Sequence, residues 1–195
     1  MKIGVILLAA GRSERFGSNK LLANFAGKPL ICRALENMAA LPATRKCVVA
    51  GSKEVADLAE AYGVDVIING EPELGQAHSI VLGVREMADM DAMLLMVADQ
   101  PRLSAASLQR LLSVFAASGK GIACLRDQSH RGNPAVFAAR YLPELLALSG
   151  DRGAKGILRA HEDDLLTVDC LGRDELCDAD TPQALELLME RMKKE

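Results

Sequence analysis

The sequence predicts an α/β fold, with residues 1–195 forming a single domain around a doubly wound, mainly parallel sheet that carries helices on both faces. Short runs such as residues 3–9 and 92–98 are apolar throughout, which is typical of strands buried on both faces. Segments with apolar residues at helical spacing separate these runs, and no linker, internal repeat or low-complexity segment divides the chain. In such a fold, the ligand crevice is expected at the carboxyl ends of the strands.

The strands are predicted from the apolar runs, each of which is only four to seven residues long and is bounded by polar or small residues. They are expected at residues 3–9, 46–50, 64–68, 92–98, 121–125, 135–138 and 165–169. The first and fourth runs lead directly into the most unusual polar sequences of the chain, so these sequences are expected at the ligand-binding edge of the sheet.

The helices are predicted from apolar residues that recur every three or four positions. They are expected at residues 29–41, 53–62, 76–87, 105–118, 142–148, 154–160 and 181–194. Pro29 and Pro182 suit the first turns of their helices, because proline has no N–H to leave unpaired there. Ser104 is the expected N-cap of the helix that follows it. Residues 12–28 are polar and contain glycine, which predicts a loop.

Composition and charge argue against several classes of function. The formal net charge is -3, so no basic excess favours binding to nucleic acid. The five cysteines lack the paired spacing of a zinc site, and we expect small buried side chains in a reducing cytoplasm. The apolar start is too short for a signal peptide and has no cleavage region, and no run reaches the about 20 residues of a membrane span. A cytoplasmic protein without a membrane partner is therefore expected.

A glycine-rich loop, LAAGRSERFGSNK at residues 8–20, follows the first predicted strand. Gly11 and Gly17 allow backbone N–H groups to approach a phosphate closely, while Arg15 and Lys20 add positive charge. The loop is neither a Walker A sequence nor a dinucleotide fingerprint. On this chemistry alone, an ordinary basic surface loop remains an alternative to a phosphate site.

The loop resembles the signature LAxGxSxRxGxxK of the MobA-like nucleotidyltransferase family, with Gly11, Ser13, Arg15, Gly17 and Lys20 in register. This family includes sugar-nucleotide pyrophosphorylases and the guanylyl- and cytidylyltransferases of molybdopterin. The resemblance covers residues 2–188, with the motifs in the expected order, and it implies a Rossmann-like nucleotidyltransferase fold.

The resemblance also implies roles for the residues of the loop. Ala9, Ala10, Gly11 and Ser13 would hold the base and phosphates of a nucleoside triphosphate. Arg15 and Lys20 would be catalytic, because they would stabilise the charge that develops on the α-phosphate and the departing pyrophosphate.

A magnesium site is expected beside this loop. Asp99 directly follows an apolar strand, where a carboxylate is well placed to hold Mg²⁺, and VADQP resembles the [GA]DxP pattern of the family. A turn or a helix cap before Pro101 is the alternative. CDADTP, which contains Asp178 and Asp180, resembles the family ending DIDTPEDL. This match favours Asp178 as the second ligand, with Asp180 as a helix cap, although the choice between the two carboxylates stays open.

Further motifs resemble the parts of the family that bind the two substrates. Asn69, Gly75 and Ser79 match an N…GxxxS pattern, which implies contact with the nucleotide at the start of a helix. RGNP resembles a G[HN]P turn on the acceptor side, and GDRGAK resembles a GDxGx[RK] segment. These two matches imply acceptor-binding roles for Asn133, Asp151 and Lys155, with ordinary loops as the alternative.

The same resemblance narrows the reaction. Guanylyltransferases of the family typically read LAGGxxxRMGGxDK, whereas this chain has Ala10, Ser13 and no Asp before Lys20. The AAGxSxR form is more similar to the cytidylyltransferases, and the Ala10 methyl leaves less room over a purine. The expected reaction joins CTP to molybdopterin and releases pyrophosphate, with a molybdoenzyme as the partner that receives the product.

Alternatives remain open at this point. The alternatives to this reaction are a guanylyltransferase of molybdopterin and a nucleotidyltransferase for a sugar or polyol phosphate, since the loop and Asp99 would be unchanged. A noncatalytic protein that binds a nucleotide or cofactor is an alternative of another class. The combination of Arg15, Lys20 and Asp99 argues against it, because a pure binder has less need of a metal beside two cations.

Overall fold

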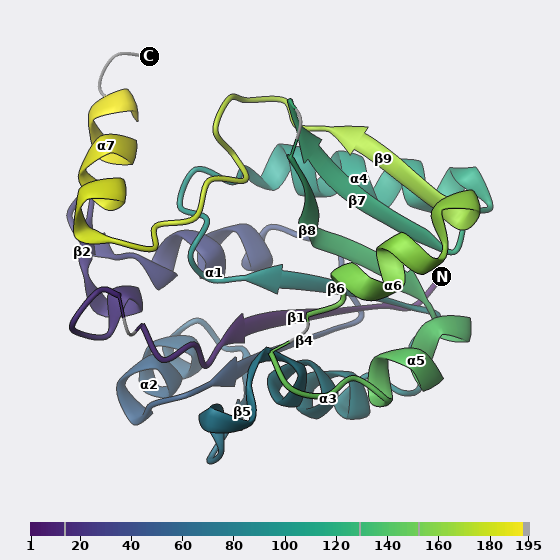
Figure 1. Ribbon diagram of the computed structural model, residues 1–195, viewed down its shortest axis with the longest axis horizontal. Helices are drawn as coiled ribbons and strands as arrows, with labels where there is room; N and C mark the ends of the chain where they lie inside the picture. Colours follow the sequence, from purple (N-terminus) through teal and green to yellow (C-terminus); the bar gives the residue numbers. More distant parts are fainter. Residues whose placement is uncertain (14, 129, 152, 193–195) are drawn as a thin grey trace.

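The structure is a computed structural model that describes residues 1–13, 15–128, 130–151 and 153–192. A seven-stranded sheet with the order β5-β4-β1-β6-β8-β7-β9 lies at its centre (Figure 1). The strands are β1 (Ile3–Ala9), β4 (Arg45–Ala50), β5 (Asp65–Ile68), β6 (Ala92–Val97), β7 (Ile122–Asp127), β8 (His130–Ala138) and β9 (Leu165–Asp169). Only β8 runs antiparallel to its neighbours β6 and β7, so the predicted mainly parallel sheet is confirmed.

Helices cover both faces of the sheet (Figure 1). They are α1 (Ile31–Ala39), α2 (Lys53–Ala61), α3 (Gln76–Glu86), α4 (Ala105–Ser118), α5 (Leu142–Leu146), α6 (Lys155–Ala160) and α7 (Pro182–Met192). Apolar side chains of α1, α2, α4 and α7 belong to one core, and those of α3, α5 and α6 belong to the other. None of the helices within the described ranges combines the length and apolar character needed to cross a membrane.

Strand β1 shows why the sheet is buried on both sides. Val5, Leu7 and Ala9 belong to the first core, whereas Ile6 and Leu8 belong to the second, because successive side chains of a strand point to opposite faces. All five are buried. The unbroken apolar run of the sequence therefore fills two cores, as expected for a central strand of a parallel sheet.

The structure corrects the predicted local structure at two places. Pro29 does not open a helix: it pairs with Asn24 in a two-stranded hairpin, formed by β2 (Asn24–Phe25) and β3 (Lys28–Pro29), and α1 begins at Ile31. The predicted loop also contains a short 3₁₀ helix, η1 (Lys20–Leu22). A proline suits the edge of a hairpin, because it need not donate a ladder hydrogen bond there.

The second correction concerns RGNP, which was expected to form a turn. These residues lie within β8, which begins at His130 and pairs with β7 from that residue onwards, His130 opposite Asp127. Strand β8 pairs with β6 only up to Leu95↔Ala135. Because β8 is antiparallel to β6, its first residues extend past the carboxyl end of β6, beside the sequence that follows β6.

Candidate functional site

A cavity of about 420 Å³ opens at the carboxyl ends of β1 and β6. It is lined by most of the residues that the sequence predicts for the nucleotide and catalytic roles: Ala9, Ala10, Gly11, Ser13, Arg15, Lys20, Gly75, Ser79 and Asp99. Asn69 is not among the lining residues. It is buried and donates from Nδ2 to the Ser79 Oγ at 2.9 Å, so it supports the wall of the cavity rather than forming its surface.

The glycine-rich loop is held in place by its own polar side chains and by β4. The backbone N–H of Lys20 donates to the Ser13 Oγ at 3.2 Å, which brings the two ends of the loop together. Ser13 has a φ of 53°, a conformation that non-glycine residues adopt uncommonly. Gly51 lies directly behind the loop, where a Cβ atom would be 2.8 Å from the Ala10 Cα. The loop therefore depends on the absence of a side chain at residue 51.

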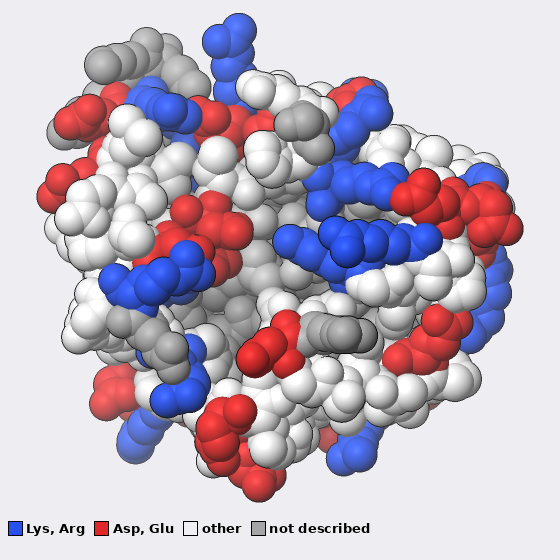
Figure 2. Space-filling view, viewed as in Figure 1, with Lys and Arg blue, Asp and Glu red and all other residues white. Residues whose placement is uncertain are grey.

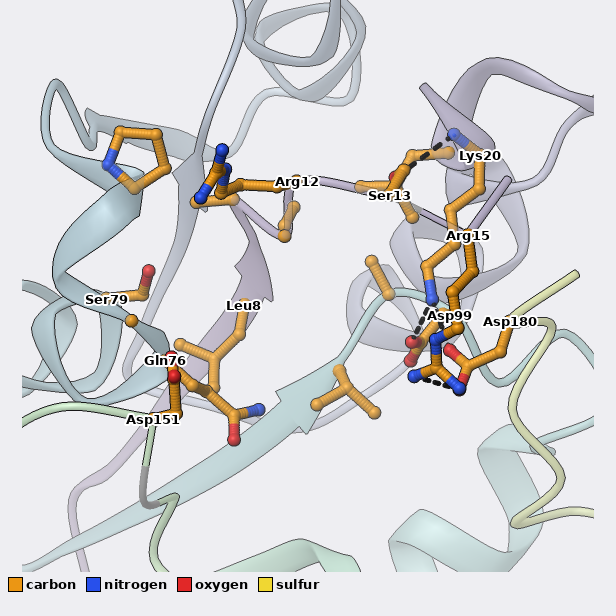
Figure 3. Close-up of a pocket in the computed structure, with 18 of the residues that line it drawn as sticks. Leu8, Arg12, Ser13, Arg15, Lys20, Gln76, Ser79, Asp99, Asp151 and Asp180 are labelled. Atoms are coloured by element: carbon orange, nitrogen blue, oxygen red, sulfur yellow. Dashed lines mark hydrogen bonds and ion pairs between the residues drawn. The ribbon is translucent and has the colours of Figure 1, made fainter. Parts of the chain in front are cut away.

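Four charged side chains form a cluster at one side of this cavity, and dashed lines in Figure 3 join them. The Lys20 Nζ lies 2.7 Å from the Asp99 Oδ2 and 2.9 Å from the Asp180 Oδ1, and the Arg15 guanidinium lies 2.9 Å from the Asp180 Oδ2. The loop and the segment before α7 thus meet through opposite charges. Ser79, Gln76 and Asp151 lie on the opposite side of the cavity (Figure 3).

The charges of this cluster stabilise one another. Burial disfavours the charged form of Lys20, but Asp99 and Asp180 outweigh it, so the pKa of the Lys20 ammonium is raised. The hydrogen bond from Lys20 is the largest cause of the lowered pKa of the Asp180 carboxyl. The Lys20 side chain is only 11% exposed and therefore presents a well-fixed positive charge at the cavity wall.

A second cavity of about 290 Å³ adjoins the first. Gln76, Val97 and Asp99 line both cavities, so the two spaces meet at the end of β6. The second cavity is also lined by His130, Arg131, Asn133, Lys155 and Asp178. In Figure 2, basic side chains gather on the right of a hollow in this face, and acidic and basic side chains lie next to each other on its left. The lining of the second cavity contains both cations, Arg131 and Lys155, and the carboxylates of Asp99 and Asp178.

The carboxylates at the junction suit a divalent cation. The Asp99 Oδ1 is buried and has no hydrogen-bond partner among the described residues. Asp178 has a raised pKa, caused first by burial and then by the charge of Asp99. Within the described ranges, no group of three His, Cys, Asp or Glu side chains is placed to hold a metal. Two carboxylates that retain places for waters and phosphate oxygens are the donor set typical of Mg²⁺, and Asp99 with Asp178 fits it.

The structure separates the predicted acceptor residues. Asn133 and Lys155 line the second cavity, whereas Asp151 lines the first. Asp151 is placed there by close packing against Gly75, where a Cβ atom would be 2.4 Å from the Asp151 Oδ1. Asp178 lines the second cavity and Asp180 the first, so both carboxylates of CDADTP reach the site.

Sequence reasoning missed several residues of the site. Gln76 lines both cavities, Gln100 is buried beside Asp99, and Gly51 packs behind the loop. Gln100 stands directly after the predicted metal ligand, so its position in sequence was a usable signal. No local pattern marks Gly51, because its role depends on contact with Ala10, which is 41 positions earlier in the chain.

Five free cysteines are described, and the expectation that they are buried holds for part of the set. Cys32, Cys47 and Cys124 are buried, and burial raises the pKa of the Cys47 thiol to about 12. Cys170 and Cys177 are partly exposed and lie in or near the segment that precedes Asp178. None of the five lines either of the two cavities within the described residues.

The fold and its two adjoining cavities define an α/β protein that can bring two ligands together at the carboxyl edge of its sheet. Residues 5–165 match the MobA-like NTP transferase domain, and the chain belongs to this family. The predicted family membership is therefore confirmed.

Known proteins of several kinds are similar to this chain. The bifunctional protein GlmU of Janthinobacterium sp. is 32% identical over 139 residues, which cover 69% of this chain and 30% of GlmU. This chain thus spans less than a third of the length of the GlmU proteins it matches. A probable molybdenum cofactor guanylyltransferase of Pyrococcus horikoshii is 29% identical over 156 residues, covering 80% of this chain and 78% of that protein.

A solved structure extends the similarity to nearly the whole chain. The crystal structure of Rv0371c from Mycobacterium tuberculosis superposes with a TM-score of 0.82 and 26% sequence identity. It covers 97% of this chain and 98% of Rv0371c. The α/β architecture described above is therefore shared with the crystal structure of Rv0371c.

Proposed function

We propose that this protein is a Mg²⁺-dependent nucleotidyltransferase that transfers a nucleoside monophosphate from a triphosphate to an anionic acceptor and releases pyrophosphate. The observation that carries the proposal is the junction of two cavities at Asp99. The glycine-rich loop lines one cavity and basic residues line the other. A triphosphate in the first cavity would place its α-phosphorus within reach of an acceptor in the second, and such positioning supplies much of the rate.

In the proposed reaction, an oxygen of the acceptor phosphate attacks the α-phosphorus, and the bond from that phosphorus to the pyrophosphate oxygen breaks. Arg15 and Lys20 carry positive charge on the loop side of the junction and would stabilise the charge that develops on the transferring and departing groups. In the structure, both cations pair with Asp180. Binding of a triphosphate would give them phosphate oxygens as alternative partners.

Asp99 and Asp178 are the proposed ligands of the metal, and the unpaired Asp99 Oδ1 supports this assignment. These two carboxylates would hold Mg²⁺, which would supply positive charge to neutralise that of the phosphates. Asp180 is the other acidic residue of the segment, and its contacts with Arg15 and Lys20 favour a role in holding the loop. Ser79, with Gly75 at the start of α3, lines the side of the first cavity assigned to the nucleotide.

CTP is the proposed nucleotide, and molybdopterin is the proposed acceptor. Ala10 is buried and lines the first cavity, and we infer that its methyl group limits the space available to a base. Asn133 and Lys155 in the second cavity are the proposed contacts with the acceptor, and a molybdoenzyme would take up the product. Asp151, which lines the first cavity, is proposed to contact the transferring group from the nucleotide side.

Two alternatives concern the substrates. The similarity to a probable molybdenum cofactor guanylyltransferase favours GTP as the nucleotide. A sugar or polyol phosphate is the alternative acceptor. Both alternatives retain the same loop and the same carboxylates. They therefore change the substrates of the proposed reaction and leave its chemistry the same.

The test is to measure pyrophosphate release from CTP, GTP, ATP and UTP with Mg²⁺, with and without molybdopterin. We expect release that is confined to CTP, depends on molybdopterin and stops when a chelator removes the metal. Equal or faster use of GTP would refute the choice of nucleotide. Release that occurs only with sugar or polyol phosphates would refute the choice of acceptor, and no release with any acceptor would indicate a protein that only binds.

The variant Ala10→Gly tests whether the methyl group of Ala10 disfavours a purine nucleotide. Removal of the methyl group should raise kcat/KM for GTP relative to CTP, because a pocket that is short of space discriminates by about 10- to 200-fold for a group of this size. An unchanged ratio, with both activities retained, would show that residue 10 does not decide the choice of base.

A further inference from the structure

Gln100 joins three segments of the chain beneath the junction of the two cavities. Its Nε2 donates to the Asn133 carbonyl oxygen at 3.3 Å, to the Leu176 carbonyl oxygen at 3.4 Å and to the Asp178 Oδ1 at 3.1 Å. The side chain is 6% exposed. One amide therefore connects the end of β6 to β8 and to the segment that carries Asp178.

These contacts determine the orientation of the amide. All three partners of Nε2 are oxygen atoms that only accept hydrogen bonds, so a flipped amide would place its own oxygen against them. In the observed orientation, the Gln100 Oε1 is buried and has no partner among the described residues. An unpaired buried carbonyl costs stability, so this side chain is a poor choice for stability alone.

Asp178 depends on this amide for its orientation. Gln100 is the only described residue that donates a hydrogen bond to the Asp178 carboxylate. The backbone around it is held separately, since the N–H of Ala179 donates to the Asp99 carbonyl oxygen at 2.9 Å. Farther along the same segment, Glu175 accepts hydrogen bonds from Ser104 and Ser107 at the start of α4. The segment thus has one backbone anchor and one side-chain anchor that do not require the Gln100 side chain.

We propose that Gln100 is a positioning residue that aims the Asp178 carboxylate at the junction beside Asp99, so that the two carboxylates hold a divalent cation together. This inference rests on the proposed function, since it assigns Asp178 to the metal site. It extends that function by explaining why a glutamine follows Asp99, and it adds Gln100 to the residues on which cation binding depends. Gln100 acts through Asp178 and does not contact the cation itself.

The experiment measures binding of Mn²⁺ alone by the loss of the electron paramagnetic resonance signal of free Mn²⁺. The proteins compared are the wild type, Q100M, D178N and the double variant Q100M/D178N. Methionine is similar to glutamine in size and has no donor. Gln109→Met is the matched control, because the Gln109 Nε2 also donates to a backbone carbonyl, that of Ala40 at 3.1 Å, but Gln109 is exposed and lines neither cavity.

We expect the dissociation constant of Mn²⁺ to rise about tenfold in Q100M, the effect expected when a residue that orients a metal ligand is removed. Q109M should bind as the wild type does. In the D178N background, Q100M should cause no further loss, since Gln100 acts through Asp178. The Tm of Q100M should stay within about 3 °C of the wild type, which a merely structural role would not predict. If Q100M fails to fold, Gln100→His, which retains an N–H donor, replaces it and should bind with intermediate affinity.

Unchanged Mn²⁺ binding in the Gln100 variant would overturn the proposal, as would an equal loss in the presence and absence of the Asp178 carboxylate. A wild-type protein that binds no Mn²⁺ would overturn it too. Pyrophosphate release by the wild type is measured separately. If the wild type releases pyrophosphate but the substitution of Gln100 leaves the dissociation constant of Mn²⁺ unchanged, only the role of Gln100 is refuted. If Mn²⁺ binding depends on both Gln100 and Asp178 but no pyrophosphate is released, only the proposed reaction is refuted.

Discussion

Gly51→Ala is predicted to displace the glycine-rich loop. A Cβ atom at residue 51 would lie 2.8 Å from the Ala10 Cα, 3.1 Å from the Ala10 carbonyl oxygen and 3.2 Å from the Ala10 carbonyl carbon. All three are backbone atoms, so no side chain can rotate away from them. Ordinary contact begins at 3.4 Å, so the backbone at residue 51, directly after β4, and the loop must separate by about 0.6 Å.

The size of this movement sets the expected effect. A misplacement of about 1 Å in a catalytic site costs on the order of 100-fold in rate, so we expect kcat/KM to fall about 10- to 100-fold. Overpacking of this kind also destabilises the folded state by about 1–3 kcal/mol. The assay is pyrophosphate release with the preferred triphosphate, together with thermal unfolding of the same sample.

Gly156→Ala is the matched control. Gly156 lies in α6, and a Cβ atom there would meet nothing within 4 Å. This variant should retain activity and gain stability by about 0.5–1 kcal/mol, because alanine favours the helix more than glycine does. A Gly51→Ala protein with the kcat/KM of the wild type would refute the reasoning, since the loop would then tolerate the displacement or would not hold the substrate.

Three further changes test other parts of the structure. Lys20→Met removes the ammonium 2.7 Å from Asp99 and should lower kcat about 100- to 1,000-fold, whereas Lys53→Met, at an exposed ion pair, should not. Glu175→Ala leaves the neutral donors at the start of α4 without their acceptor and should lower the free energy of unfolding by about 3 kcal/mol, measured by urea denaturation. Asp164→Asn should destabilise the protein by about 2 kcal/mol at pH 7, because hydrogen bonds from Tyr141 and Arg140 lower the pKa of the Asp164 carboxyl.

The pH dependence of the Asp164 effect has a definite sign. A carboxyl with a lowered folded-state pKa contributes its stability above the unfolded value of about 3.9, and this contribution is lost as the pH falls towards the folded value. The difference between the wild type and Asp164→Asn should therefore be full at pH 7 and narrow below about pH 4. A difference that does not change with pH would contradict the assignment. An unchanged kcat in Lys20→Met would contradict the first of these predictions. An unchanged free energy of unfolding in Glu175→Ala would contradict the second.

Local patterns in the sequence were sufficient for the architecture and for the loop. Runs such as residues 3–9 place apolar side chains on both faces of a strand. Such a strand must be covered on both sides, and this holds for any order of the neighbouring strands. The glycines and cations of the loop lie within 13 residues of sequence, so they could be recognised as a phosphate-binding set without the structure. Ser104 was recognisable as an N-cap for the same reason, and its Oγ accepts from the Ser107 N–H as expected.

Tertiary structure alone decided how distant residues share the site. Lys20 and Asp180 are 160 positions apart and meet because the segment before α7 returns to the glycine-rich loop. The antiparallel direction of β8 brings Asn133 past the end of β6, and packing of Asp151 against Gly75 places that carboxylate in the first cavity instead of with Lys155. By itself, the sequence determined the fold class and the chemical groups available, because periodicity and short motifs are local properties. It did not determine which groups face one another, because that depends on strand direction and on close packing between segments far apart in the chain.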